Sequence, residues 1–158
     1  MKVLIDNGHG ENTPGKRSPD GRLRAWAYSR EIADKVVFGL RKLGIDAERI
    51  VNEDTDVPLS ERCRRANAIY SATGKKAILV SIHCNAAGSG DSWMKAKGWS
   101  VFVSNNASGN SKKLADCLAQ AAECIPVSVR KPMPGQLYWQ QNLAICRDSN
   151  CPAILTEN

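Results

Sequence analysis

The chain has 158 residues, of which 42% are hydrophobic, and a formal net charge of +6. This length suits one domain with a core of its own, and the composition is that of a folded protein rather than a disordered or repetitive one. The basic residues are spread out and not interleaved with aromatic residues, so the charge favours an anionic partner but argues against nucleic acid. No apolar run is long enough to span a membrane.

The amino terminus leads directly into an apolar segment without a secretory leader, which predicts a protein that is cytoplasmic as synthesised. The six cysteines form no CxxC pair. We expect them to be reduced thiols that act as small apolar residues.

Hydrophobic periodicity predicts an alternation of strands and helices along the chain. A long polar loop over residues 10–24 follows the first strand, and loops of this length are usually functional. Residues 126–142 match neither pattern. The expected strands cover residues 3–5, 45–51, 78–83, 98–104, 142–148 and 152–158; the expected helices are one through Ile32, Val36, Leu40 and Leu43 that ends at Gly44, and two more over residues 58–72 and 111–124.

This alternation predicts a single α/β domain. Its central sheet should be mainly parallel, with about six strands and with helices on both faces. In such sheets functional residues gather beyond the carboxyl ends of the strands.

Three residues with reactive side chains lie at predicted strand ends. His9 follows the first strand, and Gly8 and Gly10 leave open space around its imidazole, although an ordinary structural histidine would explain it equally well. His83 ends the third strand and Glu157 ends the last. Two neutral imidazoles and a carboxylate are the usual composition of a catalytic zinc site, and a further carboxylate can serve as the general base.

Four segments resemble, in the same order, motifs of the zinc-dependent N-acetylmuramoyl-L-alanine amidase family, the catalytic domains of cell-wall amidases and phage endolysins: "LIDNGHGEN", "PLSERCRRAN", "VSIHCNA" and "PAILTEN". The resemblance covers nearly all of residues 1–158. It implies one zinc ion held by His9 and His83, with Glu157 as the general base. It also implies hydrolysis of the amide between N-acetylmuramic acid and L-alanine in peptidoglycan, by a monomer that acts on the wall if released. Asn85, beside the second histidine, is a candidate for substrate binding.

Two features depart from the family pattern. The resemblance places a glutamate ligand near the start of the first helix, and the matching residue here is Ala25, which has no lone pair to offer. Glu31 lies about 240° round the helix and roughly 9 Å along it from that position, and Glu11 lies in a loop, so the third ligand stays open. The chain also ends at Asn158, before the further segment found in the family.

These departures leave alternatives to the enzyme. One is a catalytically impaired protein that binds the cell wall but has lost tight zinc through Ala25. Another is a nucleotide-binding domain in which "DNGHGEN" cradles phosphate, but that loop lacks the P-loop lysine and does not open directly into a helix.

Overall fold

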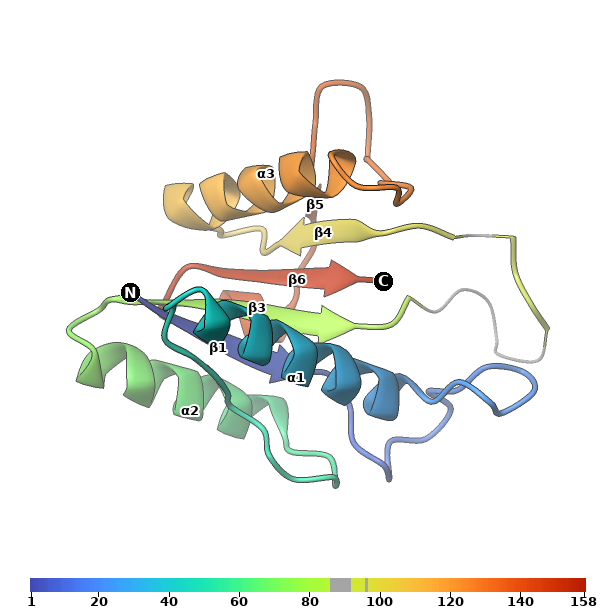
Figure 1. The fold of residues 1–158 in the computed structure, drawn as a ribbon, viewed down its shortest axis with the longest axis horizontal. Helices are drawn as coiled ribbons and strands as arrows, with labels where there is room; N and C mark the ends of the chain where they lie inside the picture. Colours follow the sequence, from blue (N-terminus) through green and yellow to red (C-terminus); the bar gives the residue numbers. More distant parts are fainter. Residues whose placement is uncertain (86–91, 96) are drawn as a thin grey trace.

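The computed structural model describes residues 1–85, 92–95 and 97–158. Its centre is a six-stranded sheet with the strand order β2-β1-β3-β6-β4-β5 (Figure 1). The strands are β1 (Lys2–Asn7), β2 (Ala47–Arg49), β3 (Ala77–His83), β4 (Ser100–Val103), β5 (Trp139–Gln140) and β6 (Ala153–Glu157). The helices are α1 (Ala25–Lys42), α2 (Leu59–Ala72), α3 (Gly109–Glu123) and α4 (Ala144–Arg147).

The sheet is mostly parallel, as predicted. Strands β2, β1, β3 and β6 run in the same direction, whereas β4 pairs with β6 in the antiparallel sense and β5 runs parallel to β4. Consecutive residues of β1 such as Leu4 and Ile5 are both fully buried. This burial on both faces is typical of parallel strands covered by helices.

Helices cover both faces of the sheet, which confirms the predicted α/β class. On one face, Leu4 and Leu79 pack with residues of α2 and α4. On the other face, Val3 and Ile5 pack against α1, and Ile154 packs against α3. The alternation of neighbouring residues between these clusters follows from the two-residue period of a strand.

Three of the four residues expected on the buried face of α1 are partly buried and pack against the core, namely Ile32, Val36 and Leu40. The expected face included Leu43, but this residue is 76% exposed and lies beyond the helix end, where Gly44 adopts a φ of +75°. A neighbouring stripe of mainly small side chains is buried more deeply and lets the helix approach the sheet closely. Its members are Ala25, Ser29, Arg30, Ala33 and Val37.

No helix in the described part of the chain is long and apolar enough to cross a membrane.

The expected strand over residues 142–148 is wrong. This segment contains the short helix α4, in which Ile145 and Cys146 are buried in the cluster below the sheet. The thiol of Cys63 on α2 also contacts the carbonyl oxygen of Ala144, at 3.7 Å. A single turn is too short to show a helical period, so long-range packing decides its conformation.

The cysteines are all free, but only part of the expectation about their environment holds. The side chains of Cys63, Cys146 and Cys151 are buried, whereas Cys117 and Cys124 are exposed on α3 and at its end. Burial raises the pKa of the Cys146 thiol to about 12, so this thiol stays protonated and acts as an apolar group.

Candidate active site

The ends of β1, β3 and β6 bring His9, His83 and Glu157 to one edge of the sheet. His83 and Glu157 are the last residues of their strands and are direct partners in the parallel pairing. The ring centroids of His9 and His83 lie 4.8 Å apart with an angle of 77° between the planes. In Figure 1 these three strands point towards the side of the molecule that carries the residue 8–24 loop and the start of α1.

Backbone hydrogen bonds fix the ends of β3 and β6 relative to each other. The backbone N–H and the side-chain amide of Asn158 donate to the carbonyl oxygen of His83, at 3.1 and 2.8 Å. The N–H of Asn85 donates in turn to the carbonyl oxygen of Asn158, at 3.0 Å. The strand tips that carry His83 and Glu157 are therefore held together, and Asn85 lies directly beside them.

His9 has a left-handed backbone conformation that its neighbours maintain. Its φ is +64°, which is uncommon for a residue with a side chain and is held only by surrounding contacts. The hydroxyl of Ser29 donates to the carbonyl oxygen of Gly8 at 2.8 Å. The guanidinium groups of Arg30 and Arg62 both donate to the carbonyl oxygen of His9, at 3.2 Å.

Arg62 is the centre of this support. It is 2% exposed and forms an ion pair with Asp6, which is equally buried, at 2.7 Å. It also donates to the carbonyl oxygens of Asn7 and Val57, both at 2.7 Å. Because Asp6 also accepts a hydrogen bond from Ser81 on β3, the buried charges are paired and the end of β1 is anchored to two elements.

Gly8 is required by the close approach of the second histidine. A Cβ atom at this position would lie 2.5 Å from Cε1 and Nε2 of His83, which is closer than side chains tolerate. The space at Gly8 that the sequence attributed to His9 is thus used by the imidazole of His83, and the space at Gly10 is used by the backbone of Asp56.

The environment favours neutral imidazoles and a protonatable carboxyl group. Burial lowers the pKa of His83 to about 4, and burial followed by the nearby Lys16 ammonium lowers the pKa of His9. Burial raises the pKa of Glu157 to about 7. Neutral imidazole is the form that binds metals, and a carboxyl group that titrates near neutrality is suited to proton transfer.

One carboxylate oxygen of Glu157 has no hydrogen-bond partner among the described residues although it is buried. Ser100 on β4 is the direct antiparallel partner of Glu157, and its buried hydroxyl is also without a partner in that part of the chain. Side chains of such partners lie on the same face of the sheet. The sequence did not identify Ser100, because β4 and β6 are far apart in the chain and no local sequence pattern predicts their antiparallel pairing.

The two imidazoles fit two positions of a metal site, but a third protein ligand is missing. The described residues contain no group of three His, Cys, Asp or Glu side chains placed to hold a metal ion. Ser29 contacts the Gly8 carbonyl, and Ala25 lies one turn earlier on the same buried face of α1, about 6 Å further towards the strand tips. The position from which the resemblance expects a carboxylate is therefore occupied by a methyl group.

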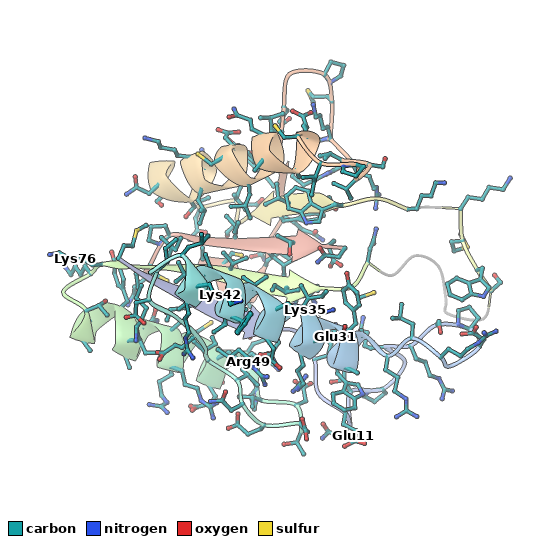
Figure 2. The ribbon with its side chains drawn as sticks, viewed as in Figure 1. Glu11, Glu31, Lys35, Lys42, Arg49 and Lys76 are labelled. Carbon is teal, nitrogen blue, oxygen red and sulfur yellow. The ribbon has the colours of Figure 1, made fainter. Side chains whose placement is uncertain are left out.

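Neither alternative acid replaces that ligand. Glu31 is exposed and forms an ion pair with Lys35 at 2.6 Å, on the outer surface of α1 (Figure 2). Glu11 is also exposed and lies in the loop beyond the start of that helix.

Together, these observations define an α/β domain with a mostly parallel sheet, in which two histidines and one acid meet at the strand tips. Comparison with known proteins gives the family. The model of the N-acetylmuramoyl-L-alanine amidase family matches residues 3–158, and the chain belongs to this family.

Individual relatives agree with this assignment. The chain is 28% identical over 152 residues to the N-acetylmuramoyl-L-alanine amidase AmiC of Neisseria meningitidis; the match covers 93% of this chain but 34% of that protein, so the chain spans about a third of this relative. A crystal structure of an N-acetylmuramoyl-L-alanine amidase from Clostridium difficile 630 is 30% identical, with a TM-score of 0.82 over 99% of this chain and 78% of that one. The amidase Ami1 from Mycobacterium smegmatis, at 20% identity, shares the fold with a TM-score of 0.78 over 99% of this chain and 81% of that one.

Proposed function

We propose that this chain hydrolyses the amide bond between N-acetylmuramic acid and L-alanine in peptidoglycan, in a zinc-dependent reaction. The single observation that supports this most strongly is the contact between the His9 and His83 rings beside Glu157, in a chain matched along almost its whole length by an amidase family. The substrate would be the wall polymer itself, and the protein would act as a monomer.

In this proposal His9 and His83 hold one zinc ion, which would polarise the amide carbonyl and acidify water when bound. Glu157 accepts a proton from the attacking water and returns it to the departing amine of L-alanine. Its raised pKa allows both steps near neutral pH, because the protonated and the ionised forms are then both accessible. Asn85, whose backbone is bonded to Asn158 beyond the tip of β3, would contact an amide of the substrate.

Digestion of purified peptidoglycan with zinc present tests the proposal. Amidase action releases new amino-terminal L-alanine without new reducing sugar ends, and both can be measured in the same digest. A rise in reducing ends alone, or no new L-alanine from either this chain or its Ala25→Glu variant, would contradict the proposed reaction.

The alanine at position 25 favours a second function, that of a cell-wall binding protein with impaired catalysis. Such a protein would sediment with insoluble peptidoglycan but release no L-alanine at any zinc concentration. Restored release by the Ala25→Glu variant alone would identify the parent chain as this binder.

A further inference from the structure

A pocket of about 220 Å³ is lined by the start of α1 and by the loop between β1 and α1, from Glu11 onwards. Its lining includes three basic side chains, Lys16, Arg17 and Arg24, and one acid, Glu11. The proposed reaction gives none of these residues a role. The charge on the lining is therefore +2, next to a site that is proposed to act on a peptide amide.

The basic side chains come from two strands of a small ladder within the loop. Arg17 and Arg24 are paired in an isolated antiparallel bridge, so their side chains lie on the same side. The N–H of Ala25 donates to the carbonyl oxygen of Lys16 at 3.0 Å, and the N–H of Ser18 donates to that of Leu23 at 2.8 Å. These bonds hold the two arginines across from each other at the start of α1.

Both arginines are exposed, so two like charges are presented to solvent on paired backbone segments. Within the described residues, none of the ion pairs involves Lys16, Arg17 or Arg24. Arg22 of the same loop differs, because it pairs with Asp20 at 2.9 Å. In the part of the chain that the structure describes, the pocket therefore has charged donors that form no ion pair.

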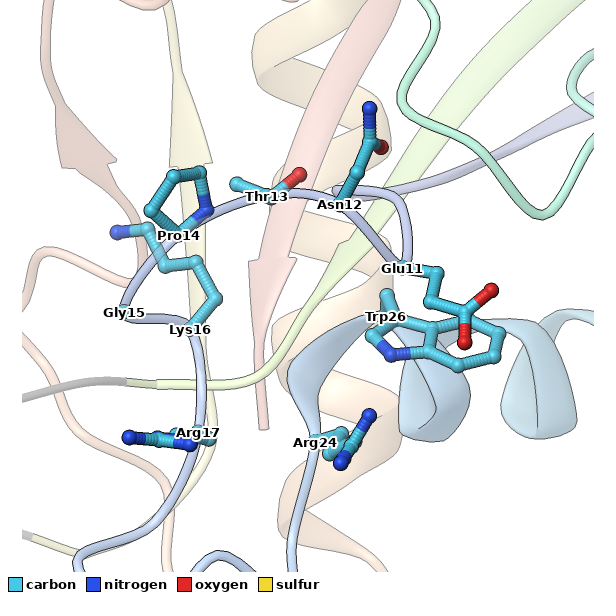
Figure 3. A pocket seen from close by; sticks show the side chains of 9 residues that line it. All are labelled: Glu11, Asn12, Thr13, Pro14, Gly15, Lys16, Arg17, Arg24 and Trp26. Atoms are coloured by element: carbon cyan, nitrogen blue, oxygen red, sulfur yellow. The ribbon is translucent and has the colours of Figure 1, made fainter.

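The remaining lining fits the same kind of ligand. The first turn of α1 contains no acidic residue and no side chain caps its N-terminus, so the partial positive charge of the helix end adds to the basic residues. Figure 3 shows Lys16 and Arg17 on one side of the pocket and Trp26 on the other, with Arg24 between the two sides. The ring of Trp26 can support the apolar part of a ligand. Glu11 lies on the Trp26 side.

The pocket lies within reach of the reacting bond. Glu11 is two residues from His9, so their Cα atoms are at most about 7 Å apart. An extended peptide also advances about 3.3–3.6 Å per residue, so a carboxylate two or three residues beyond a scissile amide lies roughly 7–11 Å from it.

We propose that this pocket binds a carboxylate of the peptide part of the substrate, and thereby selects acidic peptides. The proposal rests on the proposed function, because it takes the peptide from the amide bond that is cut at the neighbouring site. The basic side chains bind the carboxylate through charge-assisted hydrogen bonds, which are stronger than hydrogen bonds between neutral groups.

Binding to the metal-free chain tests the pocket without any need for turnover. Two soluble N-acetylmuramoyl peptides serve as probes, one with free peptide carboxylates and one in which every carboxylate is a carboxamide. Calorimetry should show that the acidic probe binds about tenfold more tightly, because hydrogen bonds to charged groups contribute more than neutral ones. Replacing both arginines (Arg17→Gln with Arg24→Gln) should remove this preference and leave the carboxamide probe unaffected.

Two further variants sharpen the test. Arg22→Gln removes a positive charge from the same loop but not from the pocket, so it should preserve the preference. Glu11→Gln removes the one acid of the lining and should strengthen binding of the acidic probe. Equal affinities for the two probes, or an equal loss with Arg22→Gln, would overturn the pocket assignment. Release of L-alanine from the wall is scored separately, so failure of the pocket and failure of the proposed reaction give different results.

Discussion

A carboxylate at position 25 should strengthen the proposed zinc site. The substitution is Ala25→Glu. Ala25 is the first residue of α1, is 7% exposed and belongs to the same buried stripe as Ser29, which contacts the backbone beside His9. A side chain longer by one methylene and a carboxylate would start from the buried face of the helix and extend towards the two imidazoles.

The size of the effect can be estimated from the ligand count. Loss of a group that only supports a metal ligand costs about 10–100-fold in metal affinity, so a direct ligand should contribute at least the upper value. We therefore expect Ala25→Glu to tighten zinc by about 100-fold or more, which corresponds to about 2.7 kcal/mol. The first turn of α1 has no acidic residue, so a carboxylate there also gains about 0.3–1 kcal/mol from the helix dipole, which offsets part of any packing cost.

Zinc affinity by chelator competition and L-alanine release from peptidoglycan should rise together in this variant. The matched control is Ala27→Glu, because residue 27 lies in the same first turn and gains the same dipole interaction but is exposed, about 200° round the helix. If the parent chain already binds zinc tightly and Ala25→Glu changes neither measurement, the reasoning is refuted, and another residue is the third ligand.

Four more predictions concern the residues around the site. In the Ala25→Glu protein, His9→Ala or His83→Ala should abolish stoichiometric zinc by metal analysis while circular dichroism stays unchanged; zinc retained by both would exclude them as ligands. In the same protein, Glu157→Gln should keep zinc but lower turnover by about 100-fold or more, and full activity would remove Glu157 from the mechanism. Arg62→Ala leaves the buried Asp6 carboxylate without its ion-pair partner. The free energy of unfolding, measured in urea, should therefore fall by about 3–5 kcal/mol. A loss below about 1 kcal/mol would show that the ion pair is dispensable. Finally, the folded-state pKa of Glu157 lies above its unfolded value, so the contribution of Glu157 to the free energy of unfolding is fully present below about pH 4 and is lost as pH rises through about 7. Over this range the metal-free parent should lose up to about 3 kcal/mol of unfolding free energy relative to Glu157→Gln. Stability curves that run parallel with pH for the two proteins would contradict the raised pKa.

The sequence by itself determined the class of the fold and the three residues at the sheet edge. Apolar runs bounded by turn residues mark strands, and parallel strands joined by helices must end on the same side. His9, His83 and Glu157 were therefore predicted to lie together from their places in the chain, and the structure brings them together. Ala25 was identified through the resemblance to the amidase family, as the residue that matches the glutamate expected near the start of α1.

Tertiary structure decided what depends on partners far away in the chain. The antiparallel pairing of β4, which places Ser100 opposite Glu157, and the helical conformation of α4 both follow from packing against distant elements. The antiparallel bridge between Arg17 and Arg24 likewise lies in a segment without hydrophobic periodicity, so the sequence could not predict it. Hydrophobic periodicity is a local property, whereas register, burial and charge proximity arise only when the chain folds back on itself, so these features could be read only from the structure.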